Sequence, residues 1–107
     1  MSKIAIVGRK DVYLGFKALG LNVIDARTAS QAEQAIQELV AQEYAIIFVA
    51  ESLAAELGGV IERYRKGATP AIVMIPDNRG SLGIARERVR KLVERAVGID
   101  ILSRKET

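Results

Sequence analysis

Four short apolar runs recur along the chain and are separated by longer amphipathic segments. Each run is rich in Val and Ile and is nearly continuous, a pattern typical of strands that are buried on both faces of a parallel sheet. The predicted strands span residues 3–8, 22–26, 45–50 and 71–75. Because amphipathic segments lie between the runs, the pattern predicts an α/β fold in which strands and helices alternate.

The segments between the strands have helical periodicity and recognisable helix-terminal residues. Gly20 is placed to end the first predicted helix. Ser30 and Glu33 have the spacing of a capping box at the start of the second. Gly58 and Gly59 weaken the third and are expected to kink it. The predicted helices span residues 11–19, 30–43 and 52–66.

The order of the strands in the sheet follows from the handedness of the connections. Right-handed crossovers leave few topologies, and we expect a Rossmann-like, four-stranded parallel sheet with the order 2-1-3-4. Pro76 closes the last strand, and residues 77–80 form a turn that is the candidate hinge. We therefore expect a globular body at 1–76, the hinge at 77–80, and an amphipathic basic helix with its tail at 81–107.

The C-terminal helix carries an apolar stripe with the steps of a heptad repeat, 3, 4, 3, 4 and 3. Amphipathic helices most often cover their own core, so this stripe could pack on the predicted sheet. An outside partner is favoured because the body already has three helices and a hinge-like turn precedes the stripe. The stripe consists of Leu82, Ala85, Val89, Leu92, Ala96 and Ile99, and Gly98 either ends or weakens the helix.

Composition removes several classes of chemistry. The chain contains neither Cys nor His, which excludes disulfides and thiolate metal sites and removes the commonest general base and metal ligand. No apolar run approaches the ~20 residues of a membrane span. The short run near the N-terminus is predicted to be a strand rather than a signal peptide. These features lead us to expect a cytoplasmic protein that does not insert into a membrane.

The net charge of +3 lies entirely in the C-terminal part of the chain. Residues 1–76 contain eight basic and eight acidic residues, whereas residues 77–107 contain eight basic and five acidic residues. A basic helix could bind nucleic acid through phosphate contacts, and this remains an alternative function. It is disfavoured because the last aromatic residue is Tyr64, while Glu87 and Glu94 interrupt the positive face.

The crevice at the carboxyl ends of the strands is the other candidate ligand site, because ligands of open α/β sheets bind there. Arg9 and Lys10 could hold an anion between Gly8 and Glu51, which makes a small-ligand or nucleotide sensor a second alternative. The loop has neither dinucleotide-binding nor Walker A spacing. It also lacks the acidic cluster of a phospho-receiver domain.

Catalysis is not predicted. Asp11 and Glu51 could form an acid–base pair across the crevice, but Glu51 is better explained as a helix N-terminal carboxylate. No serine lies in a nucleophile motif. We predict no catalytic, cofactor-binding or metal-binding residues and no cofactor.

Taken together, the motifs resemble the F subunit of V-type and A-type rotary ATPases, which some bacterial systems label G. The resemblance extends in order and spacing over nearly the whole chain. One departure is Arg9-Lys10, which follows the first strand where the family tends to be more acidic. The matching blocks are a strand ending at Gly8, "GFKALG" (15–20), "YAIIFVAE" (44–51), "PAIVMIP" (70–76) and "VRKLVERAVGIDI" (89–101).

The resemblance implies a non-catalytic rotor component of the central stalk that binds the coiled-coil shaft, the D subunit of such complexes. A component of this kind transmits torque and can regulate ATP hydrolysis, which is coupled to H⁺ or Na⁺ transport. Its indirect partners are the A/B catalytic head and the membrane ring, so it is peripheral to the membrane. The residues expected to contact the shaft are Arg88, Val89, Lys91, Leu92, Val93, Arg95, Ala96 and Val97.

Overall fold

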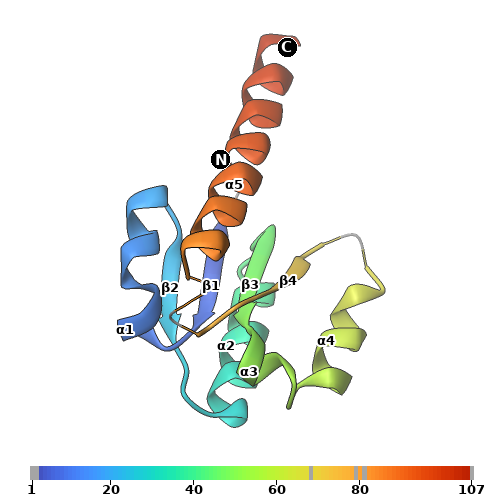
Figure 1. Ribbon diagram of the computed structural model, residues 1–107. Helices are drawn as coiled ribbons and strands as arrows, with labels where there is room; N and C mark the ends of the chain where they lie inside the picture. The colour runs from blue at the N-terminus through green and yellow to red at the C-terminus, as the bar shows by residue number, and fades with distance from the viewer. Residues whose placement is uncertain (1–2, 68, 79, 81, 107) are drawn as a thin grey trace.

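The structure, a computed structural model, describes residues 3–67, 69–78, 80 and 82–106, with backbone only for 96–106. It contains a four-stranded sheet with helices on both sides, and a long C-terminal helix that projects from the sheet (Figure 1). The elements are β1 (Ile4–Gly8), α1 (Lys10–Tyr13), η1 (Leu14–Leu19, a 3₁₀ helix), β2 (Asn22–Asp25), α2 (Ala29–Ala41), β3 (Ile46–Ala50), α3 (Glu51–Ala54), α4 (Gly58–Arg65), β4 (Ala71–Ile75) and α5 (Leu82–Glu106).

The predicted fold class is confirmed. The sheet has the order β2-β1-β3-β4, and every neighbouring pair of strands is parallel. β1 and β3 lie in the centre, and all five residues of β1 are buried. The nearly continuous apolar runs of the central strands therefore reflect burial on both faces of a parallel sheet.

The helices differ from the prediction in two places. The predicted helix 52–66 is two helices, α3 and α4, because the chain leaves helical geometry before Gly58 and Gly59, which start α4. The predicted helix 11–19 changes from α to 3₁₀ geometry at Leu14, and it ends as expected at Gly20, whose φ is +88°. α5 continues through Gly98 to Glu106.

The predicted capping box of α2 was placed two residues too late. Thr28 is the N-cap, and its hydroxyl accepts a hydrogen bond from the Gln31 N–H at 3.2 Å. The Gln31 side chain reaches back and accepts from the Arg27 N–H at 2.8 Å. Thr28 and Gln31 have the same spacing as Ser30 and Glu33, so spacing alone could not choose between the two pairs.

Candidate functional site

The first three turns of α5 pack against the body of the protein. Ala85 and Val89 are fully buried and belong to the same core as the central strands. Leu82, Leu92 and Val93 are half-buried against that core. The apolar stripe of the C-terminal helix is therefore divided: its first part covers the chain's own core, and its later part continues past it.

The contact between α5 and η1 involves Arg86. Its guanidinium carbon lies 5.8 Å from the centroid of the Phe16 ring, within the range of a cation–π interaction. The neighbouring Gly15 makes room for this arrangement, because a β-carbon there would lie 2.6 Å from Arg86 Nη2. The "GFKALG" block thus supplies the surface on which the start of α5 rests.

α5 is much longer than the sheet that supports it. A helix of 25 residues is about 37 Å long, whereas a five-residue strand such as β1 is about 17 Å long. The helix runs past the end of the sheet at which the strands begin (Figure 1). About half of α5 therefore extends beyond the body.

The predicted partner-binding residues whose side chains the structure describes fall into three groups. Val89 is buried in the chain's own core, whereas Leu92 and Val93 are only half-buried. The side chains of Ala96 and Val97 lie outside the described residues. The third group is exposed to solvent on α5 and consists of Arg88, Lys91 and Arg95.

Arg90, which was not among the predicted contact residues, holds two carboxylates of its own helix. It forms salt bridges with Glu87, three residues earlier, and with Glu94, four residues later at 2.8 Å. The hydrogen bond from Arg90 lowers the pKa of the Glu87 carboxyl, and Glu87 in turn raises the pKa of Arg90. Because these pairs are exposed to solvent, they contribute little to helix stability.

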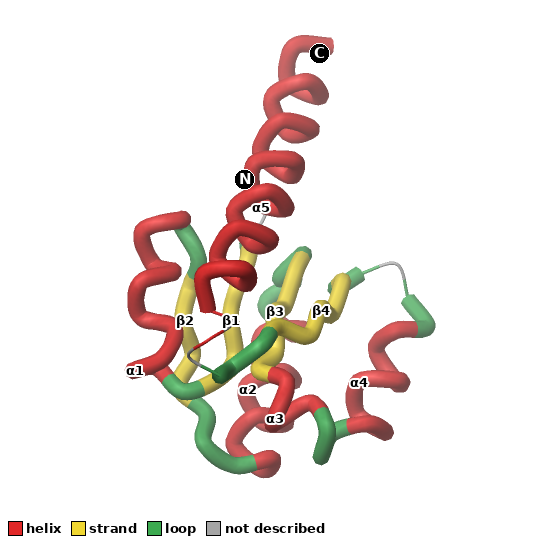
Figure 2. Tube along the Cα trace, in the orientation of Figure 1, coloured by secondary structure: helices red, strands yellow, loops and turns green. Residues whose placement is uncertain are grey.

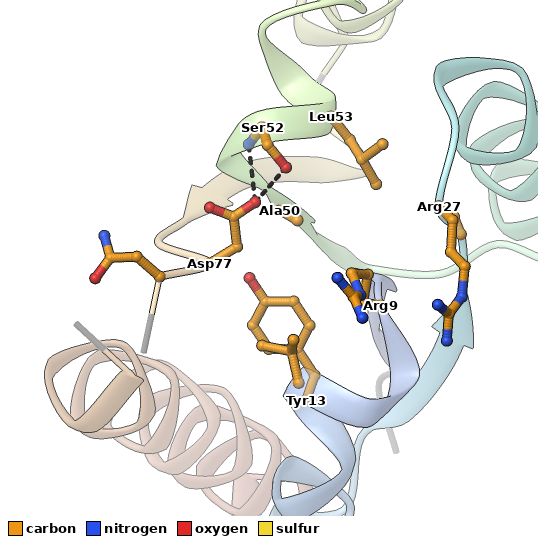
Figure 3. Close-up of a pocket in the computed structure, with 10 residues that line it drawn as sticks. Arg9, Tyr13, Arg27, Ala50, Ser52, Leu53 and Asp77 are labelled. Carbon is orange, nitrogen blue, oxygen red and sulfur yellow. Dashed lines mark hydrogen bonds between the residues drawn. The ribbon is translucent and has the colours of Figure 1, made fainter. Parts of the chain in front are cut away.

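The crevice at the carboxyl ends of the strands contains a pocket of about 270 Å³ (Figure 3). Arg9 and Arg27 line it, but both guanidinium groups are held by carboxylates. Arg9 pairs with Asp11 at 3.0 Å, and Arg27 lies 3.6 Å from Asp11 and 3.7 Å from Asp25. Of the two cations predicted to bind an anion, Arg9 is therefore paired within the protein, and Lys10 is not among the described residues that line the pocket.

The acid–base pair of Asp11 and Glu51, which the sequence already disfavours, has no supporting geometry among the described residues. Neither residue is among the described residues that line the pocket. Hydrogen bonding from Arg9 is the main cause that lowers the pKa of the Asp11 carboxyl, so this group stays ionised. Glu51 is the first residue of α3, the position that the helix dipole favours for a carboxylate.

Two hydrogen-bonded contacts that the sequence did not predict fix the chain where it leaves β4. The buried Tyr13 hydroxyl donates to the Pro76 carbonyl oxygen at 2.8 Å. Asp77 accepts hydrogen bonds from the backbone N–H of Ser52, at 3.1 Å, and from its hydroxyl. The Asp77 carboxylate thus occupies the start of α3 (Figure 3), and both contacts lie beside the predicted hinge.

Tyr13→Phe tests the first of these contacts. At neutral pH we expect a loss of about 1–2 kcal/mol in the free energy of unfolding, because the Pro76 carbonyl loses its partner. Burial is the largest cause raising the pKa of Tyr13, followed by the charges of Asp77 and Glu51. Above pH ~10 the unfolded chain ionises this tyrosine while the folded protein keeps it protonated, so native stability falls as pH rises.

The measurement is urea unfolding of both proteins at several pH values from neutral to about pH 11. The wild-type protein is expected to lose stability more steeply above pH ~10 than Tyr13→Phe, which lacks the titrating group. Parallel curves for the two proteins would contradict the assignment of this titration to Tyr13.

Among the described residues, none of the helices combines the length and the apolar composition of a membrane span. The same residues contain no cluster of three or more His, Cys, Asp or Glu side chains with the geometry of a metal site.

Comparison with known proteins gives a consistent result over nearly the full chain. The family described as "ATP synthase (F/14-kDa) subunit" matches residues 4–93. The F subunit of the V-type ATP synthase of Clostridium perfringens is 43% identical over 100 residues, which are 94% of this chain and 95% of the relative. Its counterpart in Fusobacterium nucleatum is 41% identical over 102 residues, or 95% and 97% of the two chains. The F subunit of the A-type ATP synthase of Methanothermobacter thermautotrophicus is 32% identical over 105 residues, or 94% and 97%.

Proposed function

Because the chain belongs to the ATP synthase (F/14-kDa) subunit family, we propose that it is a non-catalytic rotor subunit of the central stalk. In this proposal it binds the coiled-coil shaft subunit along α5 and transmits torque through that contact. Other subunits bind and hydrolyse or synthesise ATP and conduct the H⁺ or Na⁺ ions. The A/B head and the membrane ring are then indirect partners, and the shaft holds this chain at the membrane periphery.

The observation that carries the proposal is the length of α5 relative to the sheet. The buried residues Ala85 and Val89 anchor its first half, while the second half extends about 20 Å past the strands. A helix that only covered its own core would not need this second half. Its heptad spacing is the spacing with which a helix packs along another helix.

The structure refines the roles that the proposal gives to the predicted contact residues. Val89 anchors α5 to the body and is not offered to the shaft, because it is fully buried. Leu92 and Val93 keep exposed area at the point where α5 leaves the body, and in the proposal the stripe continues through Ala96 and Val97. Three of the exposed cations of α5, Arg88, Lys91 and Arg95, would pair with acidic residues that flank the apolar seam of the shaft.

The test is coexpression of this chain with the coiled-coil shaft subunit from the same genome, followed by size exclusion with light scattering. The full chain is compared with a version that ends at Glu94, which keeps the buried residues Ala85 and Val89. We expect a 1:1 complex of the full chain and weaker binding of the shortened one. Failure of the full chain to form a complex would refute the proposal, and oligonucleotide binding by the basic helix would then be tested.

A further inference from the structure

The two faces of the sheet are covered unequally. A β-carbon at Gly8 would lie 2.7 Å from the Tyr13 ring, so α1 packs on the face to which Gly8 belongs. Because side chains alternate along a strand, Ile6 lies on this same face. Phe48 of β3 is paired with Ile6, and Val73 of β4 is paired with Phe48, so both lie on this face as well. We call this the front face; it also carries η1 and, through Arg86 over Phe16, α5.

β3 and β4 lack a helix over part of the front face. Parallel sheets normally have both faces covered, yet Ala71 is exposed, and Ile46 and Val73 are only half-buried. Ile46 is paired with Ala71, and Val73 is next but one to Ala71 on the same strand, so the three form one patch. We name these three residues the open strip. In Figures 1 and 2, α5 crosses in front of β1, and none of the helices drawn crosses in front of β4.

The open strip lies at the same end of the sheet as the last turn of α5 that packs on the body. Ile46 and Ala71 are the first residues of β3 and β4. α5 runs toward this end of the sheet and beyond it (Figure 1), and Leu92 and Val93 form its last half-buried contacts with the core. The half-exposed surface of α5 and the open strip therefore belong to the same end of the front face.

A partner held by α5 alone would have too small a contact. The extending half of α5, about 20 Å long and 10 Å wide, covers roughly 200 Å² in projection. Each partner in a standard stable interface buries about 800 Å². The extending half of α5 alone falls short of this typical area, which favours a contribution from the body. The front-face residues of β3 and β4 are all apolar: Ile46, Phe48, Ala50, Ala71, Val73 and Ile75.

From this arrangement we propose that the open strip is the body's part of the shaft interface. It is where one helix of the coiled coil, lying along α5, also rests against the starts of β3 and β4. This inference rests on the proposed function and specifies which face of the body takes part. The occupant is a helix with an apolar seam, because the three residues of the strip are aliphatic and carry no charge.

The experiment measures the affinity of the full chain for the purified shaft subunit by calorimetry. Ala71→Glu places a charge at an exposed position of the strip and is expected to weaken binding at least tenfold. Val73→Thr, which keeps the shape of the half-buried side chain, is expected to weaken it severalfold. The matched control is Leu14→Glu: Leu14 is 52% exposed and lies on η1, which contacts β2 at the opposite edge of the sheet. It is expected to bind like the wild type.

The outcomes separate this inference from the proposed function. If both strip variants bind with wild-type affinity and keep their urea midpoints, the open strip does not contribute to binding. The proposed contact along α5 would not be affected by that result. No binding by the wild-type chain would overturn both proposals. If the chain alone is a dimer by light scattering and Ala71→Glu makes it monomeric, a second copy covers the strip, and this inference is wrong.

Discussion

Replacing Leu92 and Val93 together by Asp is expected to lower the affinity for the coiled-coil shaft more than 100-fold. Both residues are half-buried where α5 leaves the body, so they are at the centre of the proposed interface rather than at its rim. Central anchors of an interface contribute about 2 kcal/mol or more each, and about 2.8 kcal/mol corresponds to 100-fold in affinity. Two carboxylates in an apolar seam also add a desolvation cost.

The same residues touch the chain's own core, so folding has to be measured beside binding. Far-UV circular dichroism and urea unfolding establish that the variant keeps its sheet, and calorimetry with the shaft subunit gives the affinity. Ile84→Asp is the control because Ile84, on the same helix, is 60% exposed; it is expected to stay within about threefold of wild type. Undiminished binding by the double variant would refute the role of α5 as the docking helix.

Val89→Asp is expected to have the largest effect on stability, a loss of roughly 3–5 kcal/mol in the free energy of unfolding, as for an uncompensated buried charge. The Val89 side chain is fully buried in the core shared by α5 and the sheet. The variant either buries a carboxylate without a partner or releases the start of α5 and exposes the core beneath it. Both alternatives lower the stability of the whole domain.

The control for this prediction is Arg88→Asp, one residue away on the exposed side of α5. It is expected to change stability by less than about 1 kcal/mol, as surface substitutions usually do. Urea unfolding followed by circular dichroism measures both variants. If Val89→Asp kept wild-type stability and lost only its affinity for the shaft, Val89 would belong to the interface and not to the core.

The sheet could be predicted because each strand is recognised from its own residues. Strands buried on both faces appear in the sequence as continuous apolar runs, and the handedness of crossovers then leaves few strand orders. The contacts that fix the exit from β4 were not predictable, because each joins distant parts of the chain. Tyr13 and Pro76 are 63 positions apart, and Ser52 and Asp77 are 25 apart. The burial of Tyr13 was not predicted either, because a regular α-helix was expected there. In the structure the geometry changes from α to 3₁₀ at Leu14.

The part of the C-terminal stripe whose side chains the structure describes, Leu82 to Leu92, lies on one helix face, but its division between buried and half-buried residues was not predicted. Val89 and Leu92 belong to the same heptad seam, and nothing in their spacing distinguishes them. What separates them is the extent of the sheet, which supports Val89 fully and Leu92 only in part. Which residues of the seam are left exposed depends on how α5 packs on the body. The heptad spacing alone does not show this.

The burial of Ala85 and Val89 in the first half of α5 has a mechanical consequence. Because α5 is held to the body near one end only, a small change of its angle there produces a large displacement of its other end. A tilt of about 10° at Leu82 displaces the far end of a ~37 Å helix by about 6 Å, more than one helical turn. The packing of Ala85 and Val89 against the core limits that tilt. The same buried contacts that stabilise the fold therefore also determine how accurately the far half of α5 is positioned.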